Sequence, residues 1–112
     1  MTPAVSAIVV THRSASEAAA CVASLRAAFE DVGIAGETVV VDCGSGEEEA
    51  RLLRGIAADE LVLLPDNRGY SGGVNAGLER ARTAPGKKAT SALQTSRVAP
   101  RARSRPALTP PE

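Results

Sequence analysis

The sequence contains few aromatic residues, histidines and cysteines, and each shortage excludes a class of function. Aromatic residues make up 2% of the 112 residues, namely Phe29 and Tyr70, so stacking platforms for single-stranded nucleic acid are not available. His12 is the only histidine, and Cys21 and Cys43 form no CxxC or Cys/His cluster, which favours ordinary reduced cysteines over a thiolate metal site. No apolar run approaches membrane-spanning length and no signal-peptide pattern is present, so we expect a cytoplasmic protein.

Charge is divided unevenly along the chain, although the formal net charge is zero. Residues 1–82 carry seven basic and twelve acidic side chains, a net charge of −5, whereas residues 83–112 carry six basic side chains against Glu112, a net charge of +5. The second segment is rich in Ala, Ser, Thr, Pro and Arg, and holds five of the seven prolines. We therefore predict one small domain over residues 1–82 and a disordered tail over residues 83–112.

Apolar periodicity predicts three strand-helix units in the first segment. Short runs rich in Val, Ile and Leu at residues 4–10, 37–42 and 60–64 suit strands that are buried on both faces. Apolar residues recur every three or four positions after each run, and Ser14 and Glu17 have the spacing of a capping box. The alternation indicates an α/β fold with a parallel sheet and right-handed crossovers.

Polar or glycine-rich segments follow all three predicted strands, at residues 11–13, 42–45 and 66–75. Ligands of such sheets bind beyond the carboxyl ends of the strands, so these segments are the candidate site. The third segment is the glycine-rich stretch Asp66-Asn67-Arg68-Gly69-Tyr70-Ser71-Gly72-Gly73-Val74-Asn75, which could bring backbone N–H groups close to a phosphate. The alternative is a plain strand-to-helix connection.

The first strand is followed by Thr11-His12-Arg13-Ser14-Ala15-Ser16, which contains no glycine. A dinucleotide-binding unit needs its glycine fingerprint at this point, so NAD and FAD are unfavoured, and no Walker A loop is present either.

Three ordered segments resemble the nucleotide-sugar half of family 2 glycosyltransferases, which have the GT-A fold. They are Val9-Val10-Thr11-His12-Arg13, Val40-Val41-Asp42-Cys43-Gly44-Ser45, and Asn67-x-Gly69-x-x-Gly72-Gly73-x-Asn75-x-Gly77-Leu78, the last of which is similar to rhamnosyltransferase-type members. The resemblance covers residues 4–82, about the first third of such a catalytic domain, and implies binding of a UDP- or dTDP-sugar.

The resemblance also implies roles for particular residues. Thr11 and Arg13 would line the nucleotide pocket, and Asp42 would accept a hydrogen bond from the imide N–H of uracil or thymine. The wall near the ribose and diphosphate would be formed by Asn67, Gly69, Gly72 and Asn75. Asp42 could instead be a turn or helix-capping aspartate, and Ser45 is predicted to cap the second helix.

The resembled family continues with a fourth strand that pairs beside the first and ends in an Asp-x-Asp motif for Mg²⁺ or Mn²⁺. Here no carboxylate occurs between Glu79 and Glu112, so the oxygen ligands of that cation are missing. We interpret the change after about residue 82 as a truncation or frameshift, and expect no catalysis by this chain alone. The first strand would then keep an open edge that invites self-association.

The leading hypothesis is a partial family 2 glycosyltransferase that binds a nucleotide sugar for transfer to an acceptor hydroxyl. The alternative is a non-catalytic nucleotide-binding or interaction module with a basic tail. Specific nucleic acid binding through the tail arginines is the weakest hypothesis, because aromatic residues are absent from the tail.

Overall fold

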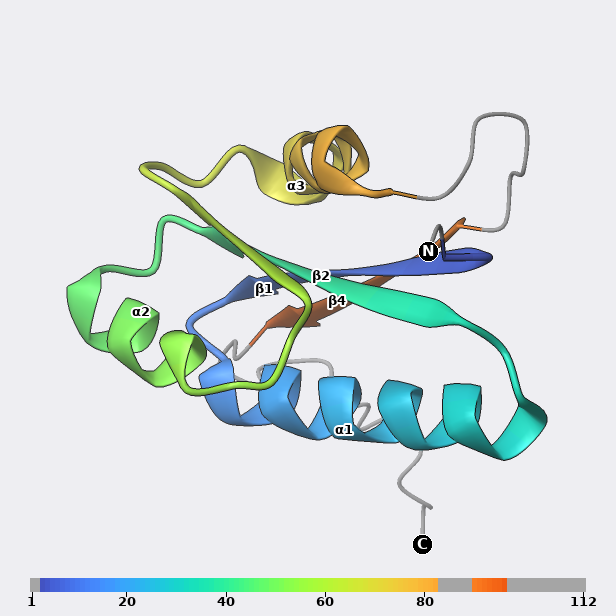
Figure 1. Ribbon diagram of the computed structural model, residues 1–112. Helices are drawn as coiled ribbons and strands as arrows, with labels where there is room; N and C mark the ends of the chain where they lie inside the picture. Colours follow the sequence, from blue (N-terminus) through green and yellow to red (C-terminus); the bar gives the residue numbers. More distant parts are fainter. Residues whose placement is uncertain (1–2, 83–89, 97–112) are drawn as a thin grey trace, which may run out of the picture.

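The computed structural model describes residues 3–82 and 90–96, which form a four-stranded parallel sheet with helices on both faces (Figure 1). The elements follow one another as β1 (Val5–His12), α1 (Ala15–Val32), β2 (Gly36–Cys43), α2 (Glu47–Arg54), β3 (Glu60–Leu64), α3 (Gly69–Arg80) and β4 (Thr90–Ser96). The strand order is β3-β2-β1-β4. The predicted α/β class and its three strand-helix units are confirmed.

The central strands β1 and β2 are buried on both faces, because α1 and α2 cover one side of the sheet and α3 covers the other (Figure 1). The α3 side of the core consists of Ile8, Val10, Val39, Val41, Cys43 and Val62. The α1 and α2 side consists of Val9, Ala15, Ala18, Val22, Val40 and Leu53. Two-sided burial explains why these strands are continuously apolar.

Helix α3 packs close to the sheet, and two of its glycines make this possible. A Cβ atom on Gly73 would lie 2.6 Å from Val10 Cγ1, and one on Gly77 would lie 2.5 Å from Ile8 Cγ2. Contacts that short are not tolerated by close-packed side chains. Gly73 and Gly77 therefore serve helix-sheet packing.

The tail prediction needs correction at residues 90–96, where the chain forms β4. This strand pairs in parallel with β1 from Ser6↔Thr90 to His12↔Ser96. The predicted open edge on β1 is therefore wrong, and so is the disorder predicted for this segment. Composition did not predict this strand, because pairing with β1 depends on backbone groups. The N–H and C=O groups of β1 can pair with any extended, proline-free segment. The uncharged stretch that meets this requirement is Thr90-Ser91-Ala92-Leu93-Gln94-Thr95-Ser96. The rest of the predicted tail lies outside the described residues.

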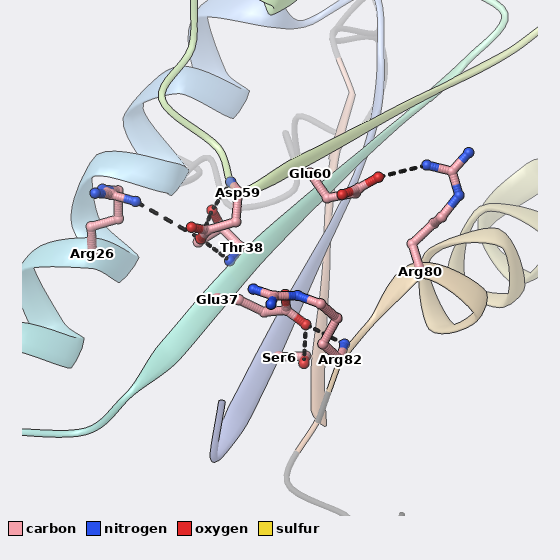
Figure 2. Close-up of polar contacts among 8 residues, drawn as sticks. All are labelled: Ser6, Arg26, Glu37, Thr38, Asp59, Glu60, Arg80 and Arg82. Carbon is pink, nitrogen blue, oxygen red and sulfur yellow. Dashed lines mark hydrogen bonds and ion pairs between the residues drawn. The ribbon is translucent and has the colours of Figure 1, made fainter. Parts of the chain in front are cut away.

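Polar side chains join the elements at the amino end of the sheet, as Figure 2 shows. The buried Glu37 carboxylate accepts hydrogen bonds from Ser6 Oγ at 2.7 Å and from the Arg82 backbone N–H at 2.5 Å. Asp59 Oδ2 accepts bonds from the backbone N–H and hydroxyl of Thr38, at 2.8 and 3.2 Å. These contacts anchor the end of α3 and the start of β3.

Candidate functional site

The segments that follow β1, β2 and β3 meet at the carboxyl end of the sheet. The strands end level with one another, since Thr11 pairs with Asp42 and Asp42 pairs with Leu63. The Gly44 N–H donates to Leu64 O at 3.2 Å, and a Cβ on Gly44 would lie 2.7 Å from the Asp66 carbonyl carbon. With a φ of +64° as well, this position requires glycine to let the two loops touch.

Asp42 and Ser45 form the centre of a hydrogen-bonded turn. Asp42 Oδ2 accepts from the Ser45 N–H at 3.1 Å, and Oδ1 accepts from the Ser45 hydroxyl at 2.5 Å. Ser45 Oγ in turn accepts from the Arg13 N–H at 2.7 Å. Asp42 is only 3% exposed, so the structure places it in the turn role that the sequence left open as an alternative.

Thr11 lies beneath the same rim and faces α1. It is 1% exposed, and its hydroxyl lies 2.8 Å from Ser14 Oγ. Ser14 is the N-cap residue of α1, as the predicted capping box requires, but its side chain makes no capping hydrogen bond. The Ala15 N–H instead donates to Glu49 Oε1 of α2 at 3.1 Å, so a neighbouring helix supplies the acceptor.

The prediction that Ser45 caps α2 is wrong. The N-cap of α2 is Gly46, and no side chain makes a capping bond there. Ser45 lies one residue before the N-cap, and its hydroxyl instead donates to Asp42 and accepts from the Arg13 N–H.

The glycine-rich stretch is helical for most of its length, because α3 begins at Gly69. Asn67 Oδ1 accepts from the Gly69 N–H at 2.9 Å, and Gly69 has a φ of +76° that favours glycine. A Cβ on Gly72 would lie 2.5 Å from Arg68 Cβ, so this glycine leaves room for the arginine stem. Asn75 lies exposed in the middle of α3, beyond the loop that precedes this helix.

Two basic side chains lie exposed at this rim. Arg68 Nε pairs with Asp66 Oδ1 at 3.1 Å, and both side chains are at least half exposed. Arg13 forms no ion pair within residues 3–82, and it is the one non-glycine residue of the described chain with a positive φ, of 53°. Its neighbour His12 contacts Cys43 O through Nδ1 at 2.7 Å, so His12 ties two strand ends together.

Cys43 is buried below the rim, and burial raises the pKa of its thiol above the ordinary value. The negative charge of Asp42 raises this pKa further, while a hydrogen bond from the Arg68 backbone and the charge of Arg68 oppose the change. Burial also raises the pKa of Cys21. Thiols with raised pKa values stay protonated at neutral pH and are poor nucleophiles, so neither cysteine is suited to covalent catalysis.

A groove of about 940 Å³ lies away from this rim, between α1 and α2 and near the amino end of β2. Apolar side chains such as Phe29, Ile34 and Leu52 line it, and its arginine, Arg26, already faces Asp59 at 3.8 Å. None of the three polar segments borders it. We therefore place the candidate site at the rim, where the backbone turns and the exposed arginines lie.

No protein-family model, curated protein or solved structure matches this chain. Within the described part of the chain, no group of three or more His, Cys, Asp or Glu side chains could hold a metal ion. No helix described here has the length and apolarity needed to cross a membrane.

Sequence reasoning placed Gly44 and Ser45 in the candidate segment 42–45 without predicting their contacts to the neighbouring turns, and it missed the contact of Glu49 with the start of α1. Asp42 and Ser45 lie in a run of turn-forming Asp, Gly and Ser residues, which was a usable signal for a local contact between them. Nothing local indicates that Ser45 reaches Arg13 or that Glu49 reaches Ala15, because each pair is more than thirty residues apart.

Proposed function

We propose that this chain is a partial family 2 glycosyltransferase whose rim binds the nucleotide diphosphate of a UDP- or dTDP-sugar. The convergence of the three polar segments at the carboxyl end of the sheet carries the proposal, since parallel sheets bind ligands at this end. The same segments carry the resemblance to that family.

The exposed groups at the rim suit a diphosphate. Arg13 is exposed and forms no ion pair within residues 3–82, and Arg68 has only an exposed partner that an anion could replace. Arginine binds phosphate oxygens through two parallel N–H donors. The amino end of α3 directly follows Arg68 in the sequence and adds a favourable dipole.

We also propose that Asp42 recognises the base, which requires its covered carboxylate to become accessible. Each carboxylate oxygen accepts one bond from Ser45 and keeps another lone pair for the imide N–H of uracil or thymine. At 3% exposure the carboxylate is covered, so the residues above it must move when the base binds.

The metal that the resemblance implies does not fit the residues present. Strand β4 lies beside β1, where the family has its metal-binding strand, but its last residues are Gln94, Thr95 and Ser96. Because β4 ends without a carboxylate, it lacks the ligands that Mg²⁺ and Mn²⁺ prefer at the position where the family holds its metal. We therefore include no metal-dependent step, and expect the chain alone to bind a nucleotide without transferring its sugar.

Calorimetric titration of the full chain with UDP, dTDP and ADP, each with and without Mn²⁺, tests the proposal. We expect UDP and dTDP to bind at least about tenfold more tightly than ADP, a difference of about 1.4 kcal/mol, with no effect of Mn²⁺. Equal affinity for all three would contradict base recognition. If none of the three nucleotides binds, the proposed function is overturned.

A non-catalytic nucleotide-binding or interaction module is the second candidate, and the missing carboxylates at the end of β4 favour it. The two candidates differ in evolutionary origin, but both predict a chain that does not transfer sugar by itself. Measurable transfer of sugar from a UDP-sugar to water or an added acceptor would exclude the module.

A further inference from the structure

We propose that Ser45 is a positioning residue, which holds the Arg13 backbone in a left-handed conformation and so presents the Arg13 guanidinium to the diphosphate. The inference rests on the proposed function and adds a residue for which the resemblance implies no such role. It concerns how one binding group is held in place before the ligand arrives.

The Arg13 backbone adopts a conformation that side chains disfavour, with a φ of 53°. Such a conformation persists only where neighbouring groups impose it. The Arg13 N–H donates to Ser45 Oγ at 2.7 Å, and this contact joins the turn after β1 to the turn after β2.

Asp42 fixes the orientation of the Ser45 hydroxyl that accepts this hydrogen bond. The Ser45 hydroxyl has one proton, which it donates to Asp42 Oδ1 at 2.5 Å, so its lone pairs are left to accept from Arg13. The Ser45 N–H binds the other carboxylate oxygen at 3.1 Å, which holds the serine backbone as well. Asp42 is itself only 3% exposed, so its buried carboxylate is a fixed partner for Ser45.

Arg13 is held on both sides along the chain. His12 contacts Cys43 O at 2.7 Å, and Ser14 is 1% exposed at the start of α1. Between two fixed residues, the exposed Arg13 side chain is the part of the turn that faces solvent. A fixed backbone lowers the conformational freedom that the guanidinium would lose on binding an anion.

A double-mutant cycle on ligand binding tests this role, with UDP and inorganic pyrophosphate as probes. We expect Ser45→Ala to weaken both probes by the same factor, about tenfold, because the lost group acts on the phosphate-binding arginine and not on the base. In an Arg13→Ala background the same substitution should change neither affinity. Ser45→Thr keeps the hydroxyl and should restore binding to within about twofold.

Arg51→Ala is the matched control, because Arg51 is also exposed and without an ion pair among residues 3–82, but lies on α2. It should leave both affinities unchanged. A Ser45→Ala loss that persists undiminished in the Arg13→Ala background would overturn the positioning role, and so would a loss confined to UDP.

A measurement without ligand separates this inference from the proposed function. NMR chemical shifts of the Arg13 backbone should move away from left-handed values in Ser45→Ala, and its amide should exchange faster, while distant core signals stay in place. Unchanged Arg13 signals would overturn the inference even if UDP binds. If the wild type binds neither probe, the proposed function fails together with the diphosphate role of Arg13, and the NMR result alone decides whether Ser45 holds this backbone.

Discussion

The two ends of the sheet use charge in different ways. At the amino end, each arginine drawn in Figure 2 has an acidic partner: Arg26 faces Asp59, Arg80 pairs with Glu60 at 2.7 Å, and Arg82 pairs with Glu37 at 3.3 Å. At the carboxyl end, the tight contacts involve hydroxyl, backbone and carboxylate groups, while Arg13 forms no ion pair with the described residues. The amino end therefore joins elements together, and the carboxyl end leaves a cation available.

The comparison makes opposite predictions for substitutions at the two ends. Removing a charged group that has a buried partner at the amino end should lower stability, because that partner then loses a hydrogen bond. Removing Arg13 at the carboxyl end should leave stability unchanged or higher and affect ligand binding instead. Sites that bind ligands commonly retain such local conflicts at a cost in stability.

The largest effect is expected for Glu37→Ala. Ser6 Oγ and the Arg82 N–H both lose this acceptor at a buried position, so the free energy of unfolding should fall by about 2–3 kcal/mol. Urea denaturation measures the loss. Glu79→Ala, at an exposed position on α3, is the control and should change stability by less than about 0.5 kcal/mol. Equal effects of the two substitutions would mean that Glu37 is not an anchor.

A smaller difference is expected between Arg82→Ala and Arg80→Ala. Arg82 contacts a carboxylate that is 3% exposed, whereas Arg80 contacts one that is 39% exposed. We expect losses of about 1 kcal/mol for Arg82, reduced by the exposure of its own side chain, and less than about 0.5 kcal/mol for Arg80. Urea denaturation at low and high salt distinguishes them, because salt screens the exposed pair more strongly. The reverse order would contradict the anchoring role of Glu37.

Arg13→Gly is expected to raise stability slightly, in contrast to the substitutions at the amino end. Glycine adopts a positive φ without the steric cost of about 1–2 kcal/mol, and its own entropic cost of about 0.5–1 kcal/mol offsets part of the gain. Stability should therefore rise by about 0–1.5 kcal/mol while affinity for pyrophosphate falls. Arg13→Ala removes the guanidinium but keeps the strain, and should show the loss of affinity without the gain. A clear loss of stability in Arg13→Gly would show that the arginine side chain supports the fold.

Much of the fold follows from local patterns. The apolar runs of β1, β2 and β3 are short and continuous because both faces of the sheet are covered, and the helical periodicity between them is plain. Strand β4 could not be predicted in this way, because its uncharged Thr and Ser residues resemble a linker and its place depends on backbone groups of β1. Helix α3 also begins earlier than its apolar residues suggest, since Gly69 and Gly72 lie within its first two turns.

The candidate site also has features that the sequence predicts and features that only the tertiary structure shows. From the sequence alone, the carboxyl ends of three strands could be named as the rim, and Asp42 could be described as either a base contact or a turn residue. Only the tertiary structure showed Asp42 buried in its turn and connected through Ser45 to Arg13, a contact between residues 32 positions apart. Periodicity and turn composition are local properties that a chain carries with it, whereas a hydrogen bond between two loops exists only after the register of the strands has brought them together.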